Sequence, residues 1–199
     1  MTGPKTLLEM SGAPLTPSAL SQAAVISIDC QNEYVTGPLA LPGVASALAE
    51  CARVIAAARA AGTPVIHIAH RGKPGGAFDA DAPRGQIAEP VKPAEGEQVI
   101  WKPLPNSFAQ TDLDAAVKAT GRKELIVIGF MTHMCVSSTV RAALDLGYRC
   151  TIVESACATR DLPAPGGGVI GATELHRASL AALSDRFAII APDAASLPA

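Results

Sequence analysis

The sequence contains few aromatic residues, few charged residues and no hydrophobic run long enough to cross a membrane. Aromatic residues make up 4% and charged residues 17% of the 199 residues, and the formal net charge is −2. Because nucleic-acid binding needs clustered positive charge, this balance does not predict a nucleic-acid partner. The first residues also lack a basic segment followed by an apolar core. We therefore expect a cytoplasmic protein with no membrane association.

The spacing of the cysteines does not indicate a disulfide framework. Their number is odd, they include no C-x-x-C spacing, and most fall in strand or helix patterns. A disulfide framework or a zinc knuckle is therefore not expected. The five cysteines are Cys30, Cys51, Cys135, Cys150 and Cys157.

Length and composition instead indicate a compact α/β protein. Hydrophobic residues make up 49% of the sequence, and a chain of this length predicts one domain, 1–199, with a sizeable core. Residues 1–22 show little periodicity and are interpreted as an arm before the first strand. Residues 71–98 are rich in Gly and Pro, and an unstructured connection of this length is typical of a lid, a binding loop or an oligomer arm.

Hydrophobic periodicity predicts strands alternating with helices. The expected strands are Ala24–Ile28, Val65–Ala69, Val99–Trp101, Leu125–Ile128, Cys150–Val153 and Phe187–Ile190. The expected helices are Gly43–Ala61, Asp112–Thr120, one that follows Cys135 and ends at Gly147, and Ala172–Leu183 with Leu175, Ala178, Ala182 and Leu183 inward. Gly166-Gly167-Gly168 is interpreted as a flexible turn near the site, and the last four residues are expected to fray. The alternation predicts a three-layer α/β/α sandwich around a six-stranded, mainly parallel sheet.

Cys135 lies where a predicted strand ends and a predicted helix begins. The unpaired N–H groups and partial positive charge of a helix N-terminus favour a thiolate over a thiol. This is the main requirement for a nucleophilic cysteine. The alternative interpretation is a buried structural cysteine.

Two further charged residues lie at the ends of predicted strands. Asp29 directly follows one strand, and Lys102 ends another. In parallel α/β sheets ligands bind beyond the carboxyl ends of the strands, so a charged residue there is placed for chemistry. The alternatives are a loop carboxylate bonded to backbone and a solvated lysine. His67 and His70 are three residues apart on a strand and therefore point to opposite faces, which argues against a metal site.

Three short motifs occur in order at these strand ends. They are Asp29-Cys30-Gln31-Asn32, Lys102 with Ser107-Phe108, and Gly129-Phe130-Met131-Thr132-His133-Met134-Cys135-Val136. Together they resemble the motifs of the isochorismatase-like cysteine hydrolases, which include nicotinamidases and N-carbamoylsarcosine amidases. The resemblance implies the strand order 3-2-1-4-5-6, a small-molecule substrate and a homo-oligomer, either dimer or tetramer. Nicotinamidases bind zinc through an Asp-x-His motif, but here Ala69 and Arg71 flank His70, so no metal or other cofactor is expected.

The resemblance also implies roles for individual residues. Cys135 would be the nucleophile, Asp29 the base that takes its proton, and Lys102 the cation that stabilises both. The backbone N–H groups of Met131 and Cys135 would form an oxyanion hole, with a cis peptide bond before Met131. The candidate substrate contacts are Asn32, His70, Phe108, Thr132 and His133. Thr132 is also expected to hydrogen-bond within the turn, and His133 to face either the mouth of the site or the surface.

These roles predict hydrolysis of a C–N bond in a small amide, carbamoyl compound or lactam through a thioester intermediate. One alternative is cleavage of a vinyl ether, as in isochorismate, which needs no cysteine nucleophile. A second is a non-catalytic binding protein, against which the presence of all three chemical groups argues. A third is a peroxide-sensing thiol, for which the motif offers no resolving cysteine.

Overall fold

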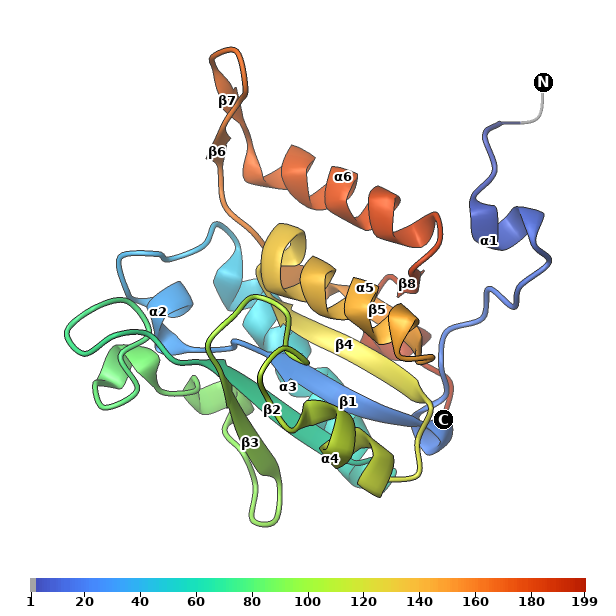
Figure 1. The fold of residues 1–199 in the computed structure, drawn as a ribbon, viewed down its shortest axis with the longest axis horizontal. Helices are drawn as coiled ribbons and strands as arrows, with labels where there is room; N and C mark the ends of the chain where they lie inside the picture. Colours follow the sequence, from blue (N-terminus) through green and yellow to red (C-terminus); the bar gives the residue numbers. More distant parts are fainter. Residues whose placement is uncertain (1–2) are drawn as a thin grey trace.

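The computed structural model describes residues 3–199 and contains a six-stranded sheet in the order β3-β2-β1-β4-β5-β8, with every neighbouring pair parallel (Figure 1). Its strands are β1 (Ala23–Ile28), β2 (Val65–His70), β3 (Gln98–Lys102), β4 (Glu124–Phe130), β5 (Arg149–Ala158) and β8 (Ala188–Ala191). The predicted α/β class and order are confirmed, because β8 is the sixth strand of this sheet. The intervening β6 (Leu162–Pro163) and β7 (Val169–Ile170) form a separate antiparallel hairpin.

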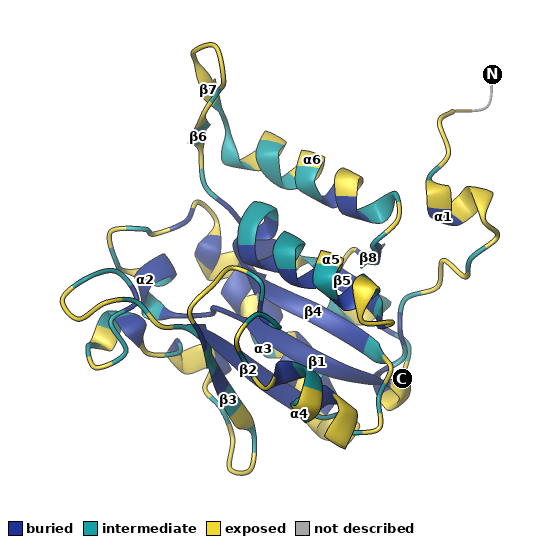
Figure 2. Cartoon of the chain, viewed as in Figure 1, coloured by how far each residue is buried: buried dark blue, intermediate teal, exposed yellow. Residues whose placement is uncertain are grey.

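Helices cover both faces of the sheet. One face packs against α3 (Val44–Ala60), and the other packs against α4 (Leu113–Ala119), α5 (Ser137–Asp145) and α6 (Ala172–Ser184). β1 is buried along its whole length, as Figure 2 shows for the centre of the sheet, because both of its faces are covered. The short elements are α1 (Leu7–Met10), η1 (Leu20–Gln22), α2 (Asn32–Val35), η2 (Pro83–Gly85), η3 (Glu89–Val91), η4 (Thr132–Val136) and η5 (Ala194–Ser196). In the part of the chain that is described, no helix is long and apolar enough to cross a membrane.

β5 is longer than its apolar run predicts. The prediction ended this strand at Val153, where polar residues interrupt the hydrophobic pattern. The strand continues to Ala158, because Cys157 and Ala158 pair with Gly129 and Phe130 beyond a register shift in the ladder. The sequence pattern does not reveal this pairing with β4. It extends β5 as far as the turn that contains Cys135.

Both ends of the described chain pack against the body of the protein. Near the C-terminus, Leu197 is buried, and the carbonyl of Pro198 accepts a hydrogen bond of 2.9 Å from the N–H of Leu20. In the N-terminal arm, Leu8 is buried and its N–H donates to the carbonyl of Asp185 at 3.0 Å. The predicted fraying of the last residues is therefore wrong, because an apolar contact and a backbone hydrogen bond hold them.

The inward face of α6 also differs from the prediction. Leu180 and Leu183 are buried, whereas Ala178 and Ala182 are exposed. Burying a leucine removes more apolar surface from water than burying an alanine, so the two leucines set the orientation of the helix.

The segment 71–98 is an ordered connection held against α2. It contains η2 and η3, and Nε of Arg84 lies 2.6 Å from Oε2 of the buried Glu33. Phe78 adopts a left-handed backbone conformation (φ 56°), and its ring packs edge-on against Tyr34 at 4.9 Å between ring centroids. A partly buried ion pair and an aromatic contact thus fix the loop beside the carboxyl end of β1.

Candidate active site

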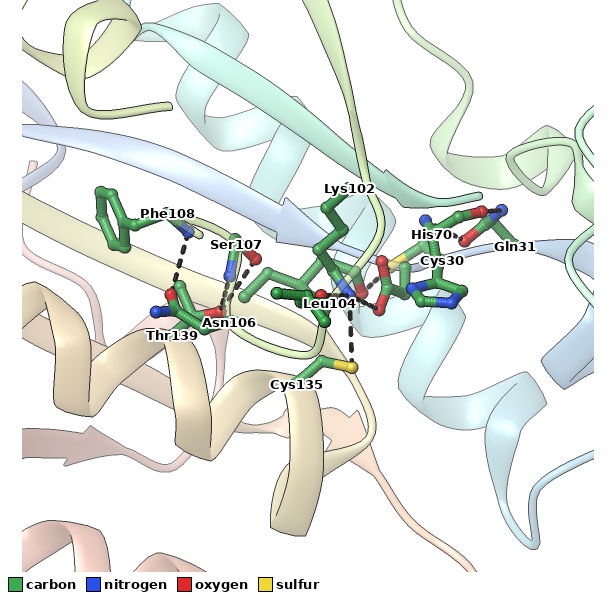
Figure 3. A network of polar contacts seen from close by, with 12 residues as sticks. Cys30, Gln31, His70, Lys102, Leu104, Asn106, Ser107, Phe108, Cys135 and Thr139 are labelled. Atoms are coloured by element: carbon green, nitrogen blue, oxygen red, sulfur yellow. Dashed lines mark hydrogen bonds and ion pairs between the residues drawn. The ribbon is translucent and has the colours of Figure 1, made fainter. Parts of the chain in front are cut away.

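Asp29, Lys102 and Cys135 meet at the carboxyl edge of the sheet. Asp29 follows β1, Lys102 ends β3, and Cys135 lies in the turn η4 after β4. Nζ of Lys102 lies 2.8 Å from Oδ2 of Asp29, 3.4 Å from Sγ of Cys135 and 3.1 Å from the carbonyl oxygen of Leu104 (Figure 3). The exposed fractions of Asp29 and Lys102 are 0%, and that of Cys135 is 4%. The ammonium therefore donates hydrogen bonds to the sulfur of Cys135 and to the carbonyl of Leu104, and forms an ion pair with the carboxylate of Asp29.

Backbone geometry at the ends of β1 and β4 sets the position of the carboxylate. Asp29 has a left-handed backbone (φ 50°), and its N–H donates to the carbonyl of Ile68 at 2.9 Å. On the neighbouring strand Gly129 has φ 114°, and a Cβ there would lie 2.0 Å from the carbonyl oxygen of Ile28. Only glycine permits this close approach of β4 to β1. The pairing brings the turn that follows β4 next to Asp29.

Burial raises the pKa of both acidic groups. The pKa of Asp29 is above its ordinary value because the carboxylate is fully buried, although the nearby charge of Lys102 acts to lower it. Burial raises the pKa of Cys135 to about 12, and the negative charge of Asp29 adds to this increase. Desolvation and the neighbouring carboxylate therefore act against the thiolate that the helix N-terminus was predicted to favour in the free protein. Asp29 and Cys135 instead share one negative charge that Lys102 balances.

The turn that carries Cys135 begins with a cis peptide bond between Phe130 and Met131, as the resemblance implied. The carbonyl of Met131 accepts hydrogen bonds from the N–H groups of Met134 (3.0 Å) and Val136 (3.3 Å). The N–H of Met131 has no hydrogen-bond partner within residues 3–199. An unused backbone donor therefore lies in the same turn as the thiol.

Thr132 and His133 connect this turn to neighbouring elements. The hydroxyl of Thr132 donates to the carbonyl of Ala158 at 3.1 Å, and Nδ1 of His176 lies 2.9 Å from it. The expectation that Thr132 bonds within the turn is thus wrong, and its hydroxyl is already engaged. His133 is half-buried, and its Nδ1 is hydrogen-bonded to the hydroxyl of Thr159.

The side chains of Asn32 and Phe108 are engaged by residues outside the cluster. The side-chain amide of Asn32 donates to the carbonyl of Pro83 at 2.9 Å and holds the long loop. Phe108 stacks on Tyr148 with 5.8 Å between ring centroids, and Figure 3 shows it well apart from Cys135. Both residues satisfy packing or backbone hydrogen bonding, so the structure does not bring these two predicted substrate contacts to the site.

His70 is the one other predicted contact beside the cluster, as the last residue of β2. Its ring packs edge-on against Phe78 at 5.2 Å, and its Nδ1 is buried without a hydrogen-bond partner in the described chain. Burial lowers the pKa of His70, and the charge of Lys102 lowers it further. The imidazole is therefore neutral at neutral pH.

Sequence reasoning assigned no role to Gln31 or Tyr34. The side chain of Gln31 exchanges hydrogen bonds with the backbone of His70 (2.9 and 2.8 Å) and donates to the carbonyl of Gly85 at 2.7 Å, so it ties the loop after β1 to β2. Tyr34 is buried, and its ring packs edge-on against Phe130, which precedes the turn of Cys135, at 6.0 Å between ring centroids. Burial raises the pKa of Tyr34, and the negative charge of Asp29 raises it further. The signal in the sequence that could have pointed to Tyr34 is a polar aromatic residue shortly after Asp29.

Within residues 3–199 no three or more His, Cys, Asp or Glu side chains form a group suited to hold a metal ion. His67 is hydrogen-bonded to Glu97, with 2.8 Å between Nε2 and Oε2, on a part of β2 distant from His70. The charged and nucleophilic groups that meet at this site are a carboxylate, an ammonium and a thiol.

Comparisons with known proteins agree with this arrangement. A family model described as the isochorismatase domain matches residues 23–194. The structure is similar to the crystal structure of an isochorismatase from Pseudomonas putida KT2440, with 47% identity, a TM-score of 0.93 and coverage of 98% of this chain and 100% of that one. The chain is 34% identical to a streptothricin hydrolase of Streptomyces noursei over 203 residues, covering 99% of this chain and 80% of that protein. It is 31% identical to the maleamate amidohydrolase of Pseudomonas putida over 151 residues, covering 67% and 70%.

The chain therefore belongs to the isochorismatase family. Its relatives in this family are hydrolases and include amidohydrolases that act on C–N bonds.

Proposed function

We propose that this protein is a cysteine hydrolase that cleaves a C–N bond of a small amide, carbamoyl compound or lactam without a metal. The observation that carries the proposal is the position of the Lys102 ammonium, which contacts both Asp29 and Cys135 in a cluster whose three side chains are buried. In such a site a proton can pass from thiol to carboxylate without creating unbalanced charge, because the ammonium stabilises the negative charge on either group.

The first half of the reaction forms an acyl-enzyme. Asp29 takes the proton of Cys135, and the thiolate attacks the carbonyl carbon of the substrate. The charge that develops on the carbonyl oxygen is stabilised by the backbone N–H groups of Met131 and Cys135, and losing one such donor typically costs a factor of about 10² to 10³ in rate. The protonated Asp29 then donates its proton to the leaving nitrogen, which departs as ammonia or an amine, and a thioester remains on Cys135.

The second half releases the acid. A water molecule loses its proton to Asp29 and attacks the thioester carbonyl, and the C–S bond breaks. The proton returns from Asp29 to the sulfur of Cys135, which restores the starting state. The raised pKa of Asp29 suits this role, because a carboxyl group of ordinary pKa holds a proton too weakly to exchange it near neutral pH.

The test is turnover of a panel of primary amides, N-carbamoyl compounds and lactams, followed by release of ammonia or amine. We expect at least one substrate whose hydrolysis disappears in Cys135→Ala and is unchanged by a chelator. Thr132→Ser, which keeps the hydroxyl that joins the turn to β5, is the matched control and should retain activity. Hydrolysis that persists in Cys135→Ala, or that stops on addition of the chelator, would contradict a metal-free thiol mechanism.

We also propose that the chain forms a homo-oligomer, which the resemblance supports. Light scattering on the purified protein gives the assembly mass directly. A single species at the mass of one chain, 20.3 kDa, at all concentrations would contradict it.

A further inference from the structure

The motif residue Ser107 is buried and hydrogen-bonded to Thr139 of α5, the helix that follows Cys135. The exposed fractions of Ser107 and Thr139 are 0% and 1%. The N–H of Ser107 donates to Oγ1 of Thr139 at 3.0 Å, and the hydroxyl of Thr139 donates to Oγ of Ser107 at 2.8 Å (Figure 3). These two bonds join the loop that follows Lys102 to the helix that follows the nucleophile candidate.

The hydroxyl of Thr139 is directed to the loop and not to its own helix. A serine or threonine within a helix commonly donates to a carbonyl three or four residues earlier. On α6, Ser179 and Ser184 do so, with bonds to the carbonyls of Leu175 (2.7 Å) and Ala181 (2.9 Å). The proton of the Thr139 hydroxyl goes instead to the serine of the loop. This hydroxyl therefore holds the loop on α5.

The segment 103–106, between Lys102 and Ser107, has few other attachments. Within residues 3–199 it forms hydrogen bonds only with the loop itself and, through the carbonyl of Leu104, with Nζ of Lys102 at 3.1 Å. Two prolines restrict its backbone. One end of the segment is fixed in β3, where the carbonyl of Lys102 accepts from the N–H of Arg71 at 3.0 Å. The other end is fixed by Ser107, so the bonds of Ser107 help to set where the Leu104 carbonyl lies.

The Leu104 carbonyl is a neutral acceptor for an ammonium that also contacts two acidic groups. Nζ of Lys102 lies 2.8 Å from Oδ2 of Asp29 and 3.4 Å from Sγ of Cys135. A lysine stem is flexible, so its ammonium is held in place by what it contacts. Because Coulomb attraction grows as the distance shrinks, an ammonium without the carbonyl would be drawn towards the carboxylate and away from the sulfur.

We propose that Ser107 and Thr139 are positioning residues: by holding the loop on α5 they place the Leu104 carbonyl, which keeps the Lys102 ammonium in contact with Cys135. The consequence for hydrolysis rests on the function proposed above, but the state of the thiol can be measured without turnover. The positive charge of Lys102 acts to lower the pKa of Cys135. Releasing the loop should therefore raise the pKa of the thiol further.

The same hydrogen-bond pattern occurs a second time, at the other end of the sheet, and supplies a matched control. The N–H of Ser18 donates to Oγ1 of Thr151 at 2.8 Å, and the hydroxyl of Thr151 donates to Oγ of Ser18 at 3.0 Å. Both residues are buried. Thr151 lies near the amino end of β5, whereas the site lies at the carboxyl edge of the sheet. Thr151→Val thus removes an equivalent buried hydroxyl pair without touching the cluster.

The test measures alkylation of Cys135 by iodoacetamide. The thiol proton is lost, the sulfur attacks the carbon that carries iodine, the S–C bond forms, the C–I bond breaks and iodide leaves. The thiolate is the reacting species, so the rate follows the fraction of thiolate. We measure the rate on the folded protein between about pH 7 and pH 9 and locate the adduct by mass spectrometry, with Cys135→Ala as the blank.

In Thr139→Val we expect the alkylation rate to fall about 10-fold, which corresponds to a rise of about one unit in the pKa of the thiol. Thr139→Ser keeps the hydroxyl and should restore most of the rate. Ser107→Ala keeps the bond of its N–H and should lower the rate by a smaller factor. Thr151→Val should leave the rate unchanged, even where thermal melting shows that it destabilises the fold as much as Thr139→Val does.

A double-mutant cycle tests whether the effect passes through the ammonium. In a Lys102→Met background no ammonium remains to be positioned, so Thr139→Val should not slow alkylation further. On a substrate found with the panel, Thr139→Val should lower kcat by about 10- to 100-fold, the size typical of a misplaced group, and change KM little, because the ammonium acts on the nucleophile.

An alkylation rate unaffected by Thr139→Val would overturn the proposal, as would an equal fall in Thr151→Val or an equal effect of Thr139→Val with and without Lys102. If Thr139→Val does not fold, an unaffected rate in Ser107→Ala would overturn it. A wild-type protein in which Cys135 is neither alkylated nor catalytically active would do so too. A fall in Thr139→Val that Thr139→Ser rescues, without turnover of any amide, would count against the proposed function and not against the positioning role.

Discussion

Two carboxylates near the sheet, Asp29 and Glu97, are both paired with cations but have opposite electrostatic environments. Neither carboxylate oxygen of Asp29 receives a hydrogen bond from any residue described, and Oδ2 forms an ion pair with Nζ of Lys102 at 2.8 Å. Glu97 receives two hydrogen bonds from Arg59 (2.8 Å each), one from the N–H of Ala94 (2.8 Å), and a contact from His67 (2.8 Å). The carboxylate of Asp29 thus lacks hydrogen-bond donors, whereas the carboxylate of Glu97 receives several hydrogen bonds.

The difference shows in the direction of the two pKa shifts. Burial raises the pKa of Asp29, whereas the hydrogen bonds, led by those from Arg59, lower the pKa of Glu97 to about 2. The raised pKa of Asp29 lets this carboxylate accept a proton, which suits catalysis. The lowered pKa of Glu97 keeps that carboxylate charged, so that it can join α3, β2 and the loop before β3. The same residue chemistry therefore serves reaction at one site and stability at the other.

The largest expected effect is that of Asp29→Asn. We expect kcat on a substrate found with the panel to fall by about 10³, the range for loss of a general base. Alkylation of Cys135 by iodoacetamide at pH 7 should nevertheless become faster, because the variant removes the negative charge that raises the thiol pKa and keeps the cation of Lys102. Glu97→Gln, which neutralises the other carboxylate, should change neither rate by more than about 3-fold. Slower alkylation in Asp29→Asn would refute the shared-charge arrangement.

The pH dependence of kcat/KM should reflect the raised pKa of Asp29. Activity requires the cluster to have lost one proton, so kcat/KM should fall about 10-fold per pH unit below an apparent pKa that lies above the ordinary aspartate value of about 3.9. No alkaline loss is expected up to about pH 9, because the pKa of Cys135 is about 12. Rates measured from pH 4 to pH 9, with circular dichroism at each pH, check this. A constant kcat/KM down to pH 4 would contradict the proposed role of Asp29.

The smallest effect on activity, and a clear effect on stability, is expected for Glu97→Gln. Loss of hydrogen bonds between charged partners should lower the free energy of unfolding by about 1–3 kcal/mol at pH 7. Since the folded pKa is below the unfolded one, the contribution of Glu97 is complete above about pH 4.5 and is lost as the pH falls towards 2.

Urea unfolding at pH 7 and at pH 3 measures this difference. Glu95→Gln, an exposed position in the same loop, is the control and should change stability by less than about 0.5 kcal/mol. An equal effect of the two variants, or one for Glu97→Gln that does not shrink at pH 3, would show that the network does not stabilise the fold.

Much of the fold and three of the site positions followed from the sequence. Short apolar runs predicted the strands, because a strand buried on both faces must be apolar throughout. Segments of helical periodicity between these runs, often ended by glycine, predicted the helices. Asp29, Lys102 and Cys135 stood out because each lies at a strand end and because their motifs resemble those of one family. The resemblance also supplied the strand order and the cis bond before Met131.

Other features depend on partners distant in sequence. The extension of β5 to Ala158 needs the pairing with β4, and the roles of Asn32 and Phe108 were decided by contacts with Pro83 and Tyr148. No periodicity encodes such contacts.

The sequence by itself determined which chemical groups the protein brings to the end of its sheet. Only the tertiary structure decided their protonation and their surroundings. The pKa of Cys135 depends on how deeply the sulfur is buried and on which charges lie within a few ångströms of it. Coulomb energy and desolvation depend on distance in space, so residues far apart in sequence set them together.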